Sequence, residues 1–127
     1  MKVQSMSAQL IRDAAAIVWD EAPTASKPMY EAVDRLFQEI MGNDKLFGGK
    51  PILLGGDFRQ IPPVLRYIDR DSVAAHTLVA LPWWQSGQVK RFPLAANVRA
   101  QEDAAYASFC LHVGNGSVAF VWCWLRL

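Results

Sequence analysis

The stretch that decides the fold of this chain is Ile52-Leu53-Leu54-Gly55-Gly56-Asp57-Phe58-Arg59-Gln60-Ile61-Pro62-Pro63-Val64. An apolar segment ends in two glycines, and a carboxylate, an arginine, a glutamine and a proline pair follow. This order is typical of a buried strand that delivers polar side chains to a ligand at its carboxyl end, as in open α/β sheets. The 127 residues are enough for one small domain with one core.

A second run of the same kind lies upstream. Residues 14–19 form the continuous apolar sequence Ala-Ala-Ala-Ile-Val-Trp, and Asp20 and Glu21 follow directly. Pro23 and the β-branched and aromatic residues favour a buried parallel strand over a helix. Two strand ends of this kind side by side predict a site for the phosphates of a nucleotide.

Helical patterns flank these strands. Residues 7–13 read as the end of a short amphipathic helix. A longer helix is predicted from Ser26 to Met41, because Ser26 can cap it, Pro28 is tolerated in its first turn and Gly42 can stop it. Its apolar residues share one face: Met29, Val33, Leu36, Phe37 and Ile40.

Three more segments complete the expected order of elements. A short helix is predicted over Asp71–Leu81, capped by Asp71 and ended before Pro82. Gln88–Leu94 could be a third strand, although Pro93 weakens it. A last helix is expected over Gln101–Val113, with Tyr106, Phe109, Cys110 and Val113 on one face, and Gly114-Asn115-Gly116 ends it. Alternating strands and helices indicate an α/β layer fold.

Composition excludes several classes of protein. With 52% apolar and 20% charged residues, the chain is expected to be globular. A net charge of +1 argues against a domain that binds nucleic acid by charge alone. Cys110 and Cys123 have no zinc-ligand spacing, so two reduced thiols are expected. The N-terminus lacks a signal-peptide core and no apolar run approaches the roughly 20 residues that span a bilayer, which predicts a soluble, intracellular protein without a membrane partner.

The acids and the glutamine suggest ATP hydrolysis. That reaction needs a carboxylate near a magnesium ion and a base that orients the attacking water. Asp20 would hold the ion, through water, and Glu21 would polarise the nucleophile. Gln60 could bond both a γ-phosphate oxygen and the attacking water. The alternatives are a solvated acidic turn at Asp20-Glu21 and an ordinary Gly-Asp turn at Gly56-Asp57.

These residues carry a resemblance to a known family, the petite-integration-frequency (PIF) family of DNA helicases, and within it to the branch related to Helitron transposon helicases. The resemblance rests on three motifs: Ile17-Val18-Trp19-Asp20-Glu21-Ala22-Pro23, Phe47-Gly48-Gly49-Lys50, and the run from Gly55 to Val64. Leu94-Ala95-Ala96-Asn97-Val98-Arg99-Ala100 is similar to the family's leucine-x-x-asparagine-x-arginine motif. Phe109 to Gly116 resembles its next helix and turn.

The resemblance implies a partial RecA-like P-loop NTPase domain over residues 1–117, with a mostly parallel sheet, and leaves the apolar tail 118–127 of uncertain status. It implies an ATP-driven 5′-to-3′ helicase with catalytic Glu21, Gln60 and Arg99, and with Asp20 at the Mg²⁺. Arg99 matches the arginine that reaches the phosphates in the transition state; a surface arginine is its alternative. ATP and single-stranded or forked DNA are the implied partners. DNA repair, recombination and telomere maintenance are the implied roles, in the nucleus or alternatively the mitochondrion.

One departure from the family is large. The chain contains no G-x-x-x-x-G-K-[ST] phosphate loop. Gly49-Lys50 imitates the end of that loop, but Asp44 and Pro51 stand where it needs Gly and Ser or Thr. The sequence therefore predicts a piece of the first motor domain that lacks the phosphate-loop strand. Alone, this piece should bind ATP weakly and unwind no DNA.

Two other functions stay open. The chain could be a catalytically inactive remnant of a mobile element with at most a binding role, and the coding DNA upstream of Met1 would separate the two. It could also be another phosphate-loop ATPase with a similar magnesium-and-sensor pair, although the asparagine-x-arginine motif and the Pro62-Pro63 turn disfavour this.

Aromatic and basic residues invite a DNA-binding interpretation as well. Trp83-Trp84 could stack on bases, but packing against the core is the favoured interpretation. Five cations could touch DNA phosphates, but Asp69 and Asp71 lie among them, which favours solvated surface: Arg59, Arg66, Arg70, Lys90 and Arg91.

Overall fold

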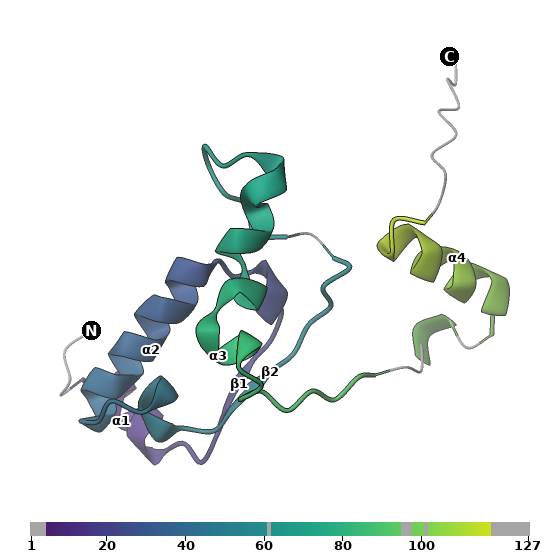
Figure 1. The fold of residues 1–127 in the computed structure, drawn as a ribbon. Coiled ribbons are helices and arrows are strands. Elements are labelled where there is room, and N and C mark those ends of the chain that lie inside the picture. The colour runs from purple at the N-terminus through teal and green to yellow at the C-terminus, as the bar shows by residue number, and fades with distance from the viewer. Residues whose placement is uncertain (1–4, 61, 95–97, 101, 118–127) are drawn as a thin grey trace. The chain divides into compact units, whose positions relative to one another are not determined.

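The computed structural model describes residues 5–60, 62–94, 98–100 and 102–117. It divides into two compact units, Met1–Lys90 and Arg91–Leu127, which Figure 1 traces along the chain. The predicted extent of one motor domain over 1–117 stays a prediction. The predicted apolar tail 118–127 lies outside the described residues.

The centre of the first unit is a pair of parallel strands, β1 (Ile17–Trp19) and β2 (Ile52–Leu54). Ile17 pairs with Ile52 and Trp19 with Leu54, so both strands end at the same edge (Figure 1). Both predicted strands and their parallel direction are therefore confirmed. The apolar residues 14–16 before β1 lie outside the strand.

The two faces of this sheet differ in burial. Ile17, Trp19, Ile52 and Leu54 pack against the core cluster, whereas Val18 is 71% exposed and Leu53 is 58% exposed. The expectation of fully buried strands is thus wrong for one face. Successive side chains of a strand point to opposite faces, and the described residues cover only one of them.

Two helices frame the strand pair. Helix α1 (Met6–Asp13) begins at Ser5, whose side chain accepts a hydrogen bond from the Ala8 amide at 3.2 Å. Helix α2 (Lys27–Met41) ends at Gly42, which has a left-handed conformation with φ of 67°. Both helices were predicted, and the glycine stop is confirmed because this conformation disfavours residues with a Cβ.

Two details of α2 differ from the prediction. Ser26 occupies the N-cap position, but its side chain makes no capping hydrogen bond. Met29 was placed on the buried face, yet it is 54% exposed, whereas Tyr30 is fully buried. The buried face follows the spacing Tyr30, Phe37 and Ile40, and a helical repeat of 3.6 residues puts position 29 about 100° away from position 30.

Short 3-10 turns and one short helix connect these elements: η1 (Ala22–Thr24), η2 (Leu46–Gly49), η3 (Arg70–His76), η4 (Leu78–Ala80) and α3 (Pro82–Gln85). The single helix predicted over residues 71–81 is therefore wrong. Thr77 is extended, with φ of −106° and ψ of 176°, and bridges to Ser26, which splits the segment in two. Asp69 rather than Asp71 stands at the N-cap position.

The expected third strand at 88–94 is also wrong, since the structure shows no strand there. Within the described residues, β1 and β2 are the only strands and they pair with each other. Pro93 has no N–H to donate to a ladder.

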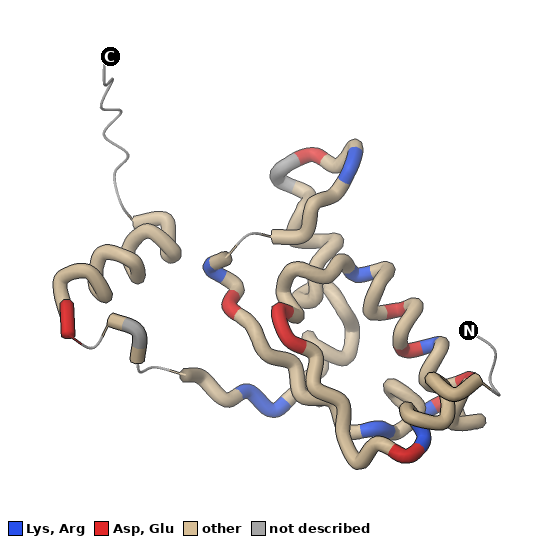
Figure 2. The backbone as a smooth tube through the Cα atoms, turned by 180° about the vertical axis from the view of Figure 1, so that it is seen from behind, with Lys and Arg blue, Asp and Glu red and all other residues tan. Residues whose placement is uncertain are grey.

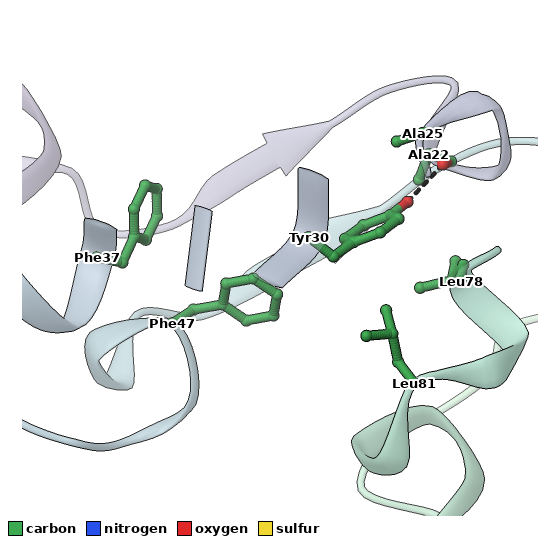
Figure 3. Close-up of a cluster of buried hydrophobic side chains, with 7 residues drawn as sticks. All are labelled: Ala22, Ala25, Tyr30, Phe37, Phe47, Leu78 and Leu81. Atoms are coloured by element: carbon green, nitrogen blue, oxygen red, sulfur yellow. Dashed lines mark hydrogen bonds between the residues drawn. The ribbon is translucent and has the colours of Figure 1, made fainter. Parts of the chain in front are cut away.

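The core of the first unit gathers seven buried residues (Figure 3): Ala22, Ala25, Tyr30, Phe37, Phe47, Leu78 and Leu81. Tyr30 lies near its centre and stacks on Trp19, with ring centroids 4.6 Å apart. Phe47 contacts both Phe37 and Trp83 edge-on. These aromatic pairs stabilise the fold by more than the burial of their apolar area alone would do.

The second unit contains η5 (Val98–Ala100) and α4 (Ala104–Gly114). Asp103 caps α4 by accepting the Tyr106 amide at 2.8 Å, and Asn115 follows its last turn. The predicted helix is confirmed. Its expected apolar face is exposed, with Tyr106 at 58% and Phe109 at 56%.

Lys50 ties the start of β2 to the end of α1. Its Nζ donates to the carbonyl oxygens of Arg12 at 2.5 Å and Ala14 at 2.7 Å. A cation at a helix C-terminus satisfies carbonyls that lack intrahelical partners. The lysine that imitates a phosphate-loop residue in the sequence is thus a structural clamp.

Replacing Lys50 with Met should lower the free energy of unfolding by about 2 kcal/mol, because two charge-assisted hydrogen bonds to backbone carbonyls are lost. The control is Lys27→Met, which removes a partly exposed ion pair with Glu31 at 4.0 Å and should cost about 0.5 kcal/mol or less. Urea unfolding of both variants measures the difference. Equal losses would contradict the clamp.

Stability should also depend on the ionisation of Tyr30. Burial raises the pKa of Tyr30 to about 12, above the value of roughly 10 expected in the unfolded chain. The neutral hydroxyl therefore stabilises the fold fully below pH 10, and this contribution is lost as the pH rises from 10 through 12. The stability advantage of the wild type over Tyr30→Phe should shrink over this range in urea titrations. For Tyr67→Phe, at a fully exposed tyrosine, no pH-dependent difference is expected.

Candidate functional site

The turn after β1 carries the two acids. Asp20 and Glu21 are both exposed, and Asp20 Oδ1 accepts a hydrogen bond from the Glu21 amide at 2.9 Å. Glu21 has a left-handed backbone with φ of 50° and ψ of 36°. A glutamate rarely adopts this conformation, so the surroundings hold it in place.

The end of β2 meets this turn directly. The Gly55 amide donates to the Trp19 carbonyl at 2.9 Å, and the Ala22 amide donates to the Gly55 carbonyl at 2.8 Å. These bonds continue the pairing of the strands beyond their last residues. They hold the acids of one strand end beside the glycines of the other.

Both glycines sit close to the acid turn. A Cβ at Gly55 would lie 3.5 Å from Asp20 Oδ1. At Gly56, where φ is 148°, a Cβ would lie 2.3 Å from Pro23 Cδ and 3.3 Å from the Ala22 nitrogen. Glycine at position 56 is therefore required by the approach of the other strand end as well as by its dihedral angle.

The polar run after Gly56 forms its own turn. Asp57 Oδ1 accepts the Arg59 amide at 2.9 Å, and the Asp57 carbonyl accepts the Gln60 amide at 3.2 Å. The Arg59 guanidinium lies 3.9 Å from the same carboxylate oxygen. This turn presents Gln60, whose side chain is exposed, on the segment that leaves the strand end.

Arg99 belongs to the second unit of the structure. Its backbone lies in η5 of the second unit, and its side chain is outside the description. Asn97 of the same motif also lies outside the described residues. The roles assigned to all four candidates, Asp20, Glu21, Gln60 and Arg99, stay predictions.

A magnesium ion fits the exposed carboxylates chemically. Mg²⁺ usually keeps several waters and takes one or two carboxylates together with substrate phosphates. Asp20 offers such a carboxylate, and its Oδ1 is already oriented by the Glu21 amide. In the described residues, no group of three or more His, Cys, Asp or Glu side chains could hold a metal ion. Such a group is not required here, because an ion bound through water to one carboxylate takes its other ligands from water and phosphate.

The tryptophan pair packs mainly inward. Trp83 and Trp84 both pack against the core cluster, as the packing interpretation predicted. Trp83 contacts Tyr30 and Phe47, and Trp84 lies 5.5 Å from Phe58, ring centroid to ring centroid. Phe58, which directly precedes Arg59, is 53% exposed. The aromatic contacts of Trp84 therefore extend to a side chain at the surface.

Lys and Arg are interspersed with Asp and Glu along the backbone of the first unit (Figure 2). Arg59, Arg66, Lys90 and Arg91 are exposed, and the choice between solvated surface and DNA contacts stays a prediction. Across the part of the chain that is described, no helix is long and apolar enough to cross a membrane.

The sequence analysis missed Tyr30, a buried residue that contacts the turn after β1. Tyr30 donates a hydrogen bond from its hydroxyl to the Ala22 carbonyl. The spacing of Tyr30 with Phe37 and Ile40 would have placed Tyr30 on the buried face. The partner of its hydroxyl follows only from the tertiary structure.

Comparison with known proteins gives a consistent result. A family model described as PIF1-like helicase matches residues 1–121. A search of curated proteins found no match. Among solved structures, the chain is similar to a Pif1 helicase from Bacteroides in complex with ADP-AlF3 and single-stranded DNA, with a TM-score of 0.67 and 17% identity. A second structure, of Bacteroides Pif1 bound to single-stranded DNA, matches with a TM-score of 0.50 and 23% identity over 59% of this chain and 20% of that one.

These matches support the predicted fold. The first covers 91% of this chain, and the parallel strand pair with flanking helices agrees with a RecA-like helicase domain. The chain spans only 28% of the length of that Bacteroides helicase.

Replacing Gly56 with Ala should destabilise the fold by about 3 kcal/mol, because the new Cβ would overlap Pro23 at a strained backbone angle. Gly87→Ala is the matched control. Its φ is also positive, at 77°, but nothing lies within 4 Å of the added Cβ, so about 1 kcal/mol is expected. Chemical unfolding compares the two, and a loss at Gly56 no larger than at Gly87 would refute the close approach of the strand ends.

Proposed function

The chain belongs to the PIF1-like helicase family, and from this premise we propose that it supplies the hydrolysis and sensor motifs of an ATP-driven DNA helicase motor. The observation that carries the proposal is the joining of the two strand ends. Hydrogen bonds from Gly55 to Trp19 and from Ala22 to Gly55 bring the acid pair beside the start of the glycine-to-glutamine run. Phosphate chemistry at the carboxyl ends of parallel strands needs this arrangement.

Each residue has a distinct task in this proposal. Asp20 holds the magnesium ion of Mg-ATP, through water. Glu21 is one residue away, exposed and held in a fixed backbone conformation, and acts as the base that orients the attacking water. Bound magnesium neutralises charge that develops on the phosphate oxygens.

Gln60 and Arg99 respond to the γ-phosphate. Gln60 lies on the exposed turn organised by Asp57, from which an amide can bond both a phosphate oxygen and the attacking water. Arg99 would stabilise the charge of the transition state, a contribution that can reach roughly 10³–10⁵ in rate. Both roles rest on the family resemblance and on the chemistry of the side chains.

The 127 residues contain no phosphate-cradling loop, and we propose that another segment of a longer protein supplies it. Backbone N–H groups and a lysine of such a loop hold the β- and γ-phosphates, and Lys50 cannot replace that lysine because it is bonded to Arg12 and Ala14. The 127-residue chain alone should therefore bind ATP weakly.

The proposed partners and roles follow the family. Two of the Bacteroides Pif1 structures hold single-stranded DNA, and one of these two also holds ADP-AlF3. For the complete protein we propose ATP-driven, 5′-to-3′ unwinding of forked or single-strand-tailed DNA in repair, recombination or telomere maintenance, in the nucleus or the mitochondrion.

The second candidate is an inactive remnant of a mobile element. The missing phosphate loop favours it, because such a protein would keep the fold of the hydrolysis motifs without turning over ATP. An in-frame phosphate loop encoded upstream of Met1 would exclude it.

Glu21→Gln in the full-length protein should lower kcat for DNA-stimulated ATP hydrolysis by about 10²- to 10⁴-fold, the usual contribution of a positioned base. ATP binding should be retained, because the amide keeps the shape of the side chain. Glu31→Gln is the control, since Glu31 lies on α2 and its carboxylate pairs with Lys27 at 4.0 Å. Steady-state ATPase assays with and without single-stranded DNA measure both.

Two results would contradict the proposal. Wild-type turnover by Glu21→Gln would remove Glu21 from the reaction. ATP turnover by the purified 127-residue chain, abolished by Glu21→Gln, would show that no other segment is needed to hold the phosphates.

A further inference from the structure

We propose that Tyr30 is a positioning residue for the acid pair: its buried hydroxyl fixes the Ala22 carbonyl and thereby the turn that presents Asp20 and Glu21. The inference rests on the proposed function, in which those acids do the chemistry. It adds a residue that lies on a different element and touches neither nucleotide nor metal.

The contact itself is fully enclosed. Tyr30 is 0% exposed and Ala22 is 1% exposed, and the Tyr30 hydroxyl donates to the Ala22 carbonyl. Figure 3 shows the ring reaching from α2 to η1 with its oxygen against that carbonyl. A buried polar group without a partner is costly, so both oxygens favour the arrangement in which they meet.

The ring cannot shift to follow a moving turn. Trp19 stacks on one side, with an interplanar angle of 28°, and Trp83 contacts the ring edge-on at 6.0 Å between centroids. Trp19 is the last residue of β1 and directly precedes Asp20. Tyr30 therefore packs against the end of the strand whose following turn it contacts. The two ring contacts thus hold the Tyr30 hydroxyl in place, and its hydrogen bond fixes the position of the Ala22 carbonyl.

The backbone of Ala22 makes three hydrogen bonds. Its amide donates to Gly55 at 2.8 Å, its carbonyl accepts the Ala25 amide at 3.0 Å, and the same carbonyl accepts the Tyr30 hydroxyl. The first bond fixes the turn to β2 and the last fixes it to α2. Glu21 immediately precedes this anchored peptide.

Glu21 needs such an anchor because its backbone is strained. Its left-handed φ of 50° persists only where neighbouring structure over-determines it. The Glu21 amide donates to Asp20 Oδ1 at 2.9 Å and the Thr24 hydroxyl donates to the Glu21 carbonyl at 2.7 Å. The peptide groups before and after Glu21 are therefore both hydrogen-bonded, while its side chain stays exposed. These bonds therefore fix the backbone position of Glu21 and leave its carboxylate accessible to a water molecule.

The hydroxyl acts as a permanent donor. Burial raises the pKa of Tyr30 to about 12, so the group stays protonated at any working pH of an ATPase. A phenylalanine would fill the same space and keep both ring contacts. The hydroxyl is therefore separable from the packing, which makes the inference testable.

Tyr30→Phe in the full-length protein should lower kcat for ATP hydrolysis about tenfold with KM changed less than twofold, since misplacing a catalytic group affects the chemical step more than binding. In the 127-residue chain, the same substitution should speed hydrogen exchange of the Ala22 amide about tenfold, measured by NMR. Amides within α1 should exchange at unchanged rates.

Ile40→Val is the matched control for lost stability. Ile40 is buried at the other end of α2, so its shortening weakens the same helix without touching the acid turn. Activities are compared at a temperature at which circular dichroism shows every variant folded. A loss of kcat in Tyr30→Phe that is no larger than in Ile40→Val overturns the proposal, as does a Tyr30→Phe protein that folds at no temperature, since its hydroxyl would then be needed for the fold itself.

Failure of this inference is distinguishable from failure of the proposed function. If Glu21→Gln is inactive and Tyr30→Phe has wild-type kcat, the acid pair catalyses but Tyr30 does not position it. If Glu21→Gln is as active as the wild type, the proposed function fails and the inference fails with it.

Discussion

Everything in the first unit depends on the parallel pairing of β1 and β2 and on its extension past the strand ends. Three in-register residue pairs would make a weak sheet by themselves, because so short a pair offers little to bury. The bonds from Gly55 to Trp19 and from Ala22 to Gly55 carry the pairing into the turn. The acids and the glycines therefore belong to one rigid edge instead of two independent loops.

The core below the sheet stabilises that edge. Tyr30, Trp19 and Trp83 form a chain of ring contacts, and Phe47 joins it from η2. Phe47 has a positive φ of 48°, and its amide donates to Asp34 Oδ1 at 2.5 Å. A side chain of α2 thus holds a strained loop at each side of the core: Asp34 holds the loop before β2 and Tyr30 holds the turn after β1.

The first unit is built like a layered α/β domain that is covered on one side. Its inward strand residues pack on the core cluster, while Val18 and Leu53 remain exposed. Parallel sheets normally have both faces covered. The exposed face accompanies a chain that spans 28% of the length of the Bacteroides helicase it resembles and whose sequence contains no phosphate-cradling loop.

The sequence by itself determined the elements whose signals are local: the two strands, α1, α2, α4, the glycine stop at Gly42 and the motif run from Gly55 to Gln60. It also indicated the family, because the motifs at residues 17–23, 47–50 and 55–64 resemble those of PIF helicases, and the family model confirms that resemblance. Only the tertiary structure decided what distant residues do to one another. Thr77 bridges to Ser26, and this interrupts the helix predicted over residues 71–81. Tyr30 is buried on α2 where Met29 was expected. Lys50 donates hydrogen bonds to carbonyl oxygens at the end of α1. Each outcome depends on a partner more than 25 residues away or on which helix face meets the sheet, and local patterns contain neither because the packing of the whole unit selects them.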